Sequence, residues 1–272
     1  MLIIRWFLLR GMIGSRVVNS RRVLESIVDK SFSQLGVTVE NRESVESFLK
    51  VIELKDLATY LHSLRTGLLA TAIAESLDKS PKPMFYAGLL HDIGKITIDN
   101  GTLSKVDYFD KMDLVKMKAH VMNGYNILKG IHDFSAEILL WHHYFKPHDP
   151  YPTDAEMKEL QSDLPEQLKK RSKEYGLMLA FADVYDAMLT RKNSKYERII
   201  KPSESEKFML NAFKEHNMSH KETLRALYDK GVLGGNYSKF FNRLKEKGIG
   251  YFKNITSVES KDLQPASAQT HR

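Results

Sequence analysis

A histidine and an aspartate stand side by side near the middle of the chain and give its first chemical signal. An apolar run from Met84 to Leu90 leads into His91 and Asp92, and Gly94 and Lys95 follow after one residue. Imidazole and carboxylate groups are common ligands of divalent first-row metals. Adjacent placement would let one residue bind one ion while the other bridges to a second. The ammonium group of Lys95 would then lie near enough to attract phosphate oxygens.

Further histidines and an aspartate recur on both sides of this pair, at or near the ends of predicted helices. The full set of predicted metal ligands is His62, His91, Asp92, His120, His142, His143 and Asp183. Each histidine taken alone has a simpler interpretation, as a hydrogen-bonded core or surface residue. Burying a neutral polar group without a partner costs roughly 1–3 kcal/mol, and burying a charge costs more. A helical protein that buries the whole set is therefore expected to share an ion among its members.

Imidazoles and carboxylates that point inward from facing helices can form a two-metal centre. Such a centre binds a phosphate group, lowers the pKa of a bridging water and supports in-line hydrolysis without a protein nucleophile. The chain contains no cysteine, which excludes thiol nucleophiles, zinc–thiolate sites and disulfides. It also has no Ser-His nucleophile motif and no glycine-rich phosphate loop.

The elements that must position these residues are helical by their hydrophobic spacing. One helix is predicted from Glu53 onward, where Leu57, Leu61 and Leu64 recur at three and four residues. The other predicted helices are a preface within 15–50, Met84 to Leu90, Lys111 to Leu128, Ser135 to His143, Tyr175 to Leu189, and three near 203–215, 219–229 and 236–247. Prolines place 144–165 in a loop, and Lys95 to Ile98 is a short extended piece at most. The expected fold class is all-α.

Composition and charge indicate a globular protein with a large core. Of the 272 residues 42% are hydrophobic, and the net charge of +7 comes from the flanks, because residues 51–200 carry 20 basic and 21 acidic residues. Arg5 and Arg10 interrupt the apolar N-terminus, and no apolar run is long enough for a signal peptide or a transmembrane helix. We therefore expect a cytoplasmic protein with no transmembrane segment and no strong signal for nucleic-acid binding.

Five short motifs, in their order and spacing, resemble the HD superfamily of metal-dependent phosphohydrolases and, more closely, its HD-GYP branch. They are Asp56-x-x-Thr59-x-x-His62-Ser63-x-Arg65, His91-Asp92-Ile93-Gly94-Lys95, His120-x-x-x-Gly124, His142-His143 and Asp183-x-Tyr185-Asp186-Ala187. The resemblance covers about residues 50–200 and implies an HD-domain helical bundle over 51–200. Around it we expect an N-terminal helical segment (1–50), a C-terminal helical extension (201–254) and a disordered tail (255–272).

The resemblance also implies a role for each residue. Two ions would be held by two ligand sets, His62, His91, Asp92 and Asp183 for one, and His120, His142 and His143 for the other, with Asp92 as the bridge. Asp92 and Lys95 are the expected catalytic residues, and Lys95 would contact phosphate and stabilise its developing charge. Asp186 is expected to orient a ligand from behind. Apart from the resemblance, Lys146, Arg191 and Lys192 are candidates to reach a second phosphate or a base, with solvated charge as the favoured interpretation. The ions would be iron or manganese, with magnesium, nickel or cobalt as alternatives.

Two positions depart from the HD-GYP pattern. The histidine pair is followed by YFKPHDPYP over 144–152, which keeps Tyr151 and Pro152 but lacks the usual glycines. Proline cannot supply the open φ values that glycine allows, so this loop must take another shape. Ala58 stands where some members of the branch carry a glutamate for a third metal, which favours a two-metal site.

The expected activity is hydrolysis of a nucleotide phosphodiester by a metal-bridging hydroxide, and the resemblance makes cyclic di-GMP the leading substrate. Cyclic mononucleotides and nucleoside monophosphates stay open as substrates, and a di-iron oxygenase on the same helical frame is a remote alternative. A second class of function is a module that binds a nucleotide without hydrolysing it. A third gives the basic flanks a nucleic-acid role, although no clear recognition helix supports it. A homodimer is also left open.

Overall fold

The structure is a computed structural model that describes residues 21–105, 109–145, 149–191, 199–213, 218–235 and 237–253. Within these ranges the chain forms helices and turns and no β-strand, which confirms the expected all-α fold class. Residues 1–20 and the predicted tail at 255–272 lie outside the described part of the chain.

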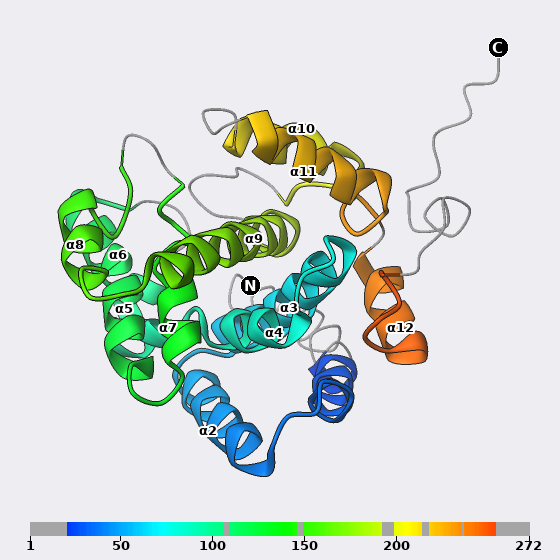
Figure 1. Ribbon diagram of the computed structural model, residues 1–272, viewed down its shortest axis with the longest axis horizontal. Coiled ribbons are helices and arrows are strands. Elements are labelled where there is room, and N and C mark those ends of the chain that lie inside the picture. The colour runs from blue at the N-terminus through cyan, green and yellow to red at the C-terminus, as the bar shows by residue number, and fades with distance from the viewer. Residues whose placement is uncertain are drawn as a thin grey trace, which may run out of the picture.

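The helices follow one another with short connections (Figure 1). After a first helix over residues 21–34 they are α2 (Val39–Lys55), α3 (Leu57–Ser76), α4 (Pro81–Leu90), the 3₁₀ helix η1 (Ile93–Thr97), α5 (Asn100–Leu103), α6 (Lys111–Leu128), α7 (Asp133–Leu139), α8 (Asp154–Leu160), α9 (Glu166–Thr190), α10 (Pro202–Ala212), α11 (Met218–Asp229) and α12 (Tyr237–Lys247).

Two segments that were predicted to be non-helical contain short helices. Within the predicted loop at 144–165, α8 begins at a capping box, in which the Glu156 carboxylate accepts from the Thr153 N–H at 2.7 Å. Met157 is buried and anchors this helix to the core. The segment from Lys95 to Ile98 lies mostly in η1, and only Ile98 has extended dihedral angles.

The central helix of the bundle is α3, which is buried along most of its length and packs against α4 and α9. Its contact with α4 depends on two glycines, because a Cβ added to Gly88 would lie 2.6 Å from the Cα of Gly67. The two backbones therefore approach closely, and this brings His62 of α3 next to His91, which directly follows α4.

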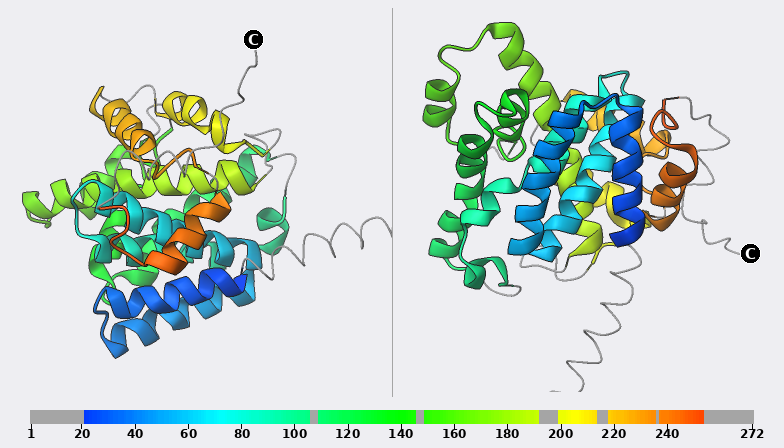
Figure 2. Two further views of the ribbon diagram at one scale, coloured as in Figure 1. Left: turned by 90° about the vertical axis from the view of Figure 1, so that its right-hand side faces the viewer. Right: turned by 90° about the horizontal axis from the view of Figure 1, so that it is seen from below.

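The helices beyond Lys201 pack on this bundle instead of standing apart from it. The α10 helix lies against α9, and α11 lies against α10. Figure 2 shows α12 beside the first helix, where the Lys30 ammonium donates to the Lys245 carbonyl at 3.2 Å. Of the helices that the structure describes, none combines the length and the apolar character needed to cross a bilayer.

Candidate metal centre

The seven predicted metal ligands lie together in the core, although five separate segments contribute them. His62 lies within α3, His91 and Asp92 directly follow α4, His120 lies within α6, His142 and His143 lie in the turn after α7, and Asp183 lies within α9. The expectation that all of them stand at or near helix ends was therefore wrong for His62, His120 and Asp183. Their helices continue past the site because buried residues recur on both sides of each ligand.

His62, His91 and Asp183 form what we call the first ligand group. The Nε2 atom of His62 lies 3.0 Å from Asp183 Oδ1 and 3.2 Å from His91 Nε2. His91 Nε2 lies 3.8 Å from the same carboxylate oxygen. Ligand atoms about 2.0–2.2 Å from one ion stand roughly 3 Å from one another. The spacing of these three atoms therefore fits a single shared ion.

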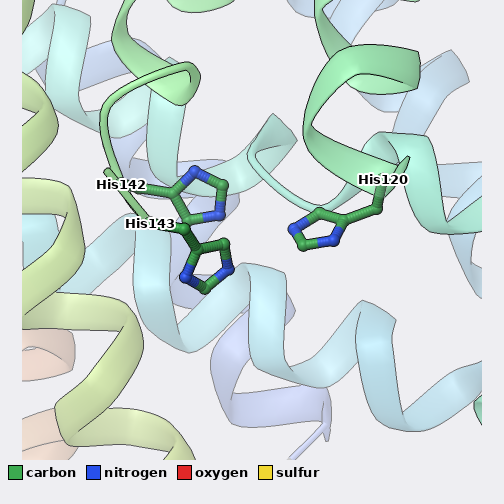
Figure 3. Close-up of side chains that lie close together, drawn as sticks. All are labelled: His120, His142 and His143. Carbon is green, nitrogen blue, oxygen red and sulfur yellow. The ribbon is translucent and has the colours of Figure 1, made fainter. Parts of the chain in front are cut away.

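His120, His142 and His143 form the second ligand group, and their candidate ligand atoms lie within 4.8 Å of one another. Figure 3 shows His142 and His143 side by side, with His120 facing them from α6. The ring centroid of His120 lies 5.6 Å from that of His142 and 5.2 Å from that of His143. This group also fits one ion, with looser spacing than the first.

Backbone carbonyls set the orientation of three of the imidazoles. Each Nδ1 donates to the carbonyl three residues earlier in the chain: His91 to Gly88 at 2.8 Å, His120 to Met117 at 2.5 Å, and His142 to Leu139 at 2.5 Å. A ring that holds its proton on Nδ1 presents the Nε2 lone pair on its other side. All three rings therefore present Nε2 to the cluster.

Asp92 lies between the two groups and faces both of them. Its Oδ2 atom is 3.4 Å from His91 Nε2 and 3.6 Å from His62 Nε2, and its Oδ1 atom is 3.6 Å from His120 Nε2. The ammonium of Lys95 donates to Asp92 Oδ2 at 2.5 Å. One carboxylate oxygen therefore serves each group, which is the placement that a bridging ligand requires.

Burial governs the acid–base state of these side chains. Removal from water lowers the pKa of His91 to about 4 and that of His120 to about 3, so both rings are neutral, the form that binds metal. Burial would raise the pKa of Asp92, but interactions with His91 and Lys95 outweigh it and hold the value well below the usual range. The pKa of Asp183 is also held low against burial, first by its hydrogen bond with His62.

A second carboxylate, Asp186, holds His62 from behind. Its Oδ2 atom accepts from His62 Nδ1 at 2.7 Å, and the Arg65 guanidinium donates to both of its oxygens, at 2.7 and 3.0 Å. Such a carboxylate–histidine pair fixes the ring and increases its basicity as a metal ligand. The placement is the one predicted for Asp186, one helical turn beyond Asp183.

The donor atoms fit divalent cations. The Nε2 atoms of His120 and His142 are buried and have no hydrogen-bond partner among the described residues. In the first group, His62 and His91 donate from Nδ1 to Asp186 and to the Gly88 carbonyl, so their Nε2 atoms carry lone pairs. These two lone pairs and an oxygen of Asp183 lie close together. Acceptors that converge without donors are satisfied by a cation. The chain thus holds two groups that could each bind a metal ion.

The other predicted site residues lie at different distances from this centre. Lys95 lies beside it, with 13% of its side chain exposed. Arg191 lies at the end of α9, where its Nη2 atom is buried, and within the described structure no hydrogen bond connects it to either group. Lys146 lies outside the described residues. Ala58, the position of the absent third-metal glutamate, is exposed near the start of α3.

Three residues around the centre carried no assigned role in the sequence. The ring centroid of Tyr151 lies 4.6 Å from that of His143, so the altered loop still places its tyrosine against the second group. Arg65 could have been assigned, because it stands three residues after His62 on the same face of one helix. Tyr237 is 51 residues from Asp186 and bonds to it, and no local pattern could have predicted that contact.

Comparisons with known proteins match the segment that carries this cluster. Residues 59–188 match the family model described as HD domain. A cyclic di-GMP phosphodiesterase of Thermotoga maritima is 31% identical over 160 residues, which are 56% of this chain and 40% of that protein. A cyclic di-GMP phosphodiesterase of Pseudomonas aeruginosa is 29% identical over 55% of this chain and 35% of its own. A 3′3′-cGAMP-specific phosphodiesterase of Vibrio cholerae is 27% identical over 61% of this chain and 31% of its own.

The segment that holds the cluster is therefore similar to an HD domain. Within that family the chain resembles the HD-GYP branch, as the motifs indicated. The matches span only two fifths or less of the length of these relatives, so the similarity concerns the domain and not the whole of each protein.

Proposed function

We propose that this chain is a metal-dependent phosphodiesterase that cleaves a cyclic dinucleotide, with cyclic di-GMP as the leading substrate. The observation that carries the proposal is the position of Asp92, whose two oxygens face two separate three-residue ligand groups. The names of the related proteins support a cyclic dinucleotide as the substrate class.

Each candidate ligand has a distinct role in this proposal. When bound, divalent ions would neutralise phosphate oxygens and make a water molecule more acidic. His62, His91 and Asp183 would hold one ion, His120, His142 and His143 would hold the other, and Asp92 would fix the distance between them.

Lys95 would help to bind the phosphate. Its ammonium already lies against Asp92 Oδ2, beside both groups. A positive charge at this point attracts a phosphodiester and stabilises the negative charge that develops on it. Arg191 and Lys146 are proposed to contact the more distant parts of the substrate.

The test combines elemental analysis with a hydrolysis screen. Purified protein is assayed for bound metals, then with added Mn²⁺ or Fe²⁺ against cyclic di-GMP, 3′3′-cGAMP, cyclic mononucleotides, nucleoside monophosphates and a bis-aryl phosphate. We expect two ions per chain and cleavage of a cyclic dinucleotide. Turnover of monophosphates alone would keep the metal chemistry but reject the substrate. Less than one ion per chain and no turnover would reject the proposal in favour of a nucleotide-binding module.

A double variant tests the assignment of the site. Replacing His91 and Asp92 together with alanine removes a nitrogen of the first group and the carboxylate between the groups. We expect metal binding and hydrolysis to be lost while the far-ultraviolet circular dichroism spectrum stays helical. Full activity in this variant would contradict the assignment of the site.

A further inference from the structure

The C-terminal extension reaches the metal centre through one side chain. Tyr237, the first residue of α12, donates from its hydroxyl to Asp186 Oδ1. Asp186 in turn accepts from His62 Nδ1 at 2.7 Å. We propose that Tyr237 is a positioning residue of the metal centre, so that the extension completes a site whose ligands all lie in the HD domain. The inference rests on the proposed function, because it assigns a role at the same centre.

The contacts of Asp186 show what the hydroxyl contributes. Its Oδ2 atom accepts from His62, from Arg65 at 3.0 Å and from Thr190 at 3.3 Å. Its Oδ1 atom accepts from Arg65 at 2.7 Å and from Tyr237. Without the tyrosine hydroxyl, Oδ1 keeps only the arginine, which also bonds to the other oxygen. Among these contacts, Tyr237 is therefore the one that bonds to Oδ1 and not to Oδ2.

The extension is itself fixed where it approaches the site. The Gly234 N–H donates to the Tyr185 hydroxyl at 2.8 Å, and Tyr185 immediately precedes Asp186 in α9. The Tyr237 ring lies 5.9 Å from the Tyr185 ring and 4.8 Å from the Phe241 ring. Burial and the adjacent Asp186 charge hold the pKa of Tyr237 well above its usual range. The hydroxyl therefore keeps its proton and acts as a donor at neutral pH.

Loss of the Tyr237 hydroxyl is expected to weaken metal binding at the first ligand group. A carboxylate behind a ligating histidine sets the direction of the ring, and loss of such outer contacts typically weakens metal binding about 10- to 100-fold. Removing the Tyr237 hydroxyl leaves Asp186 in place but less restrained. We therefore expect an effect at the lower end of that range.

A second tyrosine of the same extension provides a matched control. Tyr228 is buried, its ring lies 6.5 Å from the Tyr185 ring, and its hydroxyl donates to Ser205 Oγ at 3.0 Å. Tyr228→Phe therefore removes a buried hydroxyl from the same part of the chain while leaving the Tyr237–Asp186 contact intact. Any general loosening of the extension should affect both variants alike.

The experiment compares the full-length wild type, Tyr237→Phe and Tyr228→Phe after removal of metal with a chelator. Mn²⁺ is titrated into each protein by calorimetry, and the thermal unfolding of the metal-free forms is recorded. We expect the Mn²⁺ dissociation constant to rise about tenfold in Tyr237→Phe and to change less than about twofold in Tyr228→Phe. The metal-free variants should unfold at similar temperatures.

Two results would overturn the inference. Equal Mn²⁺ affinity in the two variants would show that the Tyr237 hydroxyl does not position the centre. Weaker binding in Tyr237→Phe that merely parallels a lower unfolding temperature would assign the effect to folding. Failure of the metal centre in the proposed function gives a different outcome, because the wild type itself would then bind no Mn²⁺, whereas a different substrate would leave this comparison unchanged.

Discussion

The two candidate ligand groups are supported in different ways. In the first group, His62 is held by Asp186, which is itself held by Arg65 and Tyr237. In the second group, the Nδ1 atoms of His120 and His142 donate to backbone carbonyls, as that of His91 does in the first group. The Nε2 atoms of His120 and His142 have no hydrogen-bond partner in the described structure. Charged side chains from several helices thus hold His62 of the first group, whereas the hydrogen bonds of His120 and His142 in the second group are local to their own segments.

This difference indicates how metal binding and folding are coupled at each group. Charged hydrogen-bonded networks contribute to the fold even without a metal, provided that every member is paired. Buried nitrogens without partners cost free energy until an ion satisfies them. The first group should therefore keep its geometry in the metal-free protein, and the second should gain more from loading. Five substitutions test this contrast.

The largest effect is expected from Asp186→Asn. The substitution leaves the Arg65 charge buried without its carboxylate, and breaking a buried pair in this way costs about 3–5 kcal/mol. We expect the free energy of unfolding of the metal-free protein to fall by about 3 kcal/mol in chemical denaturation. Asp29→Asn is the control, because it breaks an exposed pair with Arg42 and should cost less than about 1 kcal/mol. Equal losses of unfolding free energy in the two variants would show that the buried Arg65–Asp186 pair stabilises the fold no more than an exposed ion pair does.

Gly94→Ala tests the backbone that places Asp92 opposite His120. A Cβ at Gly94 would lie 1.9 Å from the His120 carbonyl oxygen, so α6 would have to move. We expect a loss of about 1–3 kcal/mol in the free energy of unfolding and weaker Mn²⁺ binding at the second group. Gly101→Ala is the control, since its nearest atom is a side-chain oxygen of Asp99 at 3.2 Å. Similar behaviour of the two variants would contradict the close approach.

Glu75→Gln concerns a buried carboxyl that, unlike Asp186, forms no ion pair with an arginine in the described part of the chain. Burial raises the pKa of Glu75 to about 7, against 4.5 for an exposed glutamate. Below pH 4.5 the group is neutral in both folded and unfolded states. Between pH 4.5 and 7 the unfolded chain releases the proton first, so stability falls as the pH rises through this window.

Glutamine removes that penalty. At pH 8 we expect Glu75→Gln to be about 1–2 kcal/mol more stable than the wild type, and at pH 4.5 to be nearly equal to it. Urea unfolding of the metal-free proteins at the two pH values measures the difference. A variant that is less stable than the wild type at pH 8 would show that the ionised carboxylate is well solvated or paired.

Much of this centre was predictable from the sequence because its ligands are chemically distinctive and locally spaced. The helix at Lys111–Leu128 has the predicted bounds, since its apolar stripe and its ends are local features. In contrast, α9 begins at Glu166, well before the predicted Tyr175, because its first turns are polar and show no apolar stripe. The segment predicted as a loop contains α8, because the prolines near 150 favour a loop and the capping box at Thr153 is a weaker local signal.

Long-range contacts account for the rest of what the sequence could not supply. The expected split into two ligand groups came from the family resemblance, because hydrophobic spacing within one helix does not show which helices face each other across the core. Tyr237 meets Asp186 only because the start of α12 lies next to α9, and that requires the tertiary structure. Local patterns thus point to the candidate metal ligands, while the residues that hold them in place follow from the tertiary packing.

The smallest change in stability, and the sharpest contrast between the groups, is expected from His120→Leu. Leucine is similar in size to histidine and removes a buried Nε2 that has no partner in the described structure. Loss of the imidazole therefore costs the metal-free fold little stability. We expect the free energy of unfolding of the metal-free variant to stay within about 1 kcal/mol of the wild-type value. The second group would nevertheless lose one of its three ligands, so elemental analysis should find one ion per chain instead of two.

His62→Leu is the counterpart in the first group. It leaves Asp186 Oδ2 without the Nδ1–H that it accepts at 2.7 Å, so this variant should be less stable than His120→Leu when both are metal-free. Parallel urea titrations of the two variants measure the difference. If His120→Leu proved the more destabilised of the two, the second group would be the better supported one, and the contrast between charged and backbone support would have to be reversed.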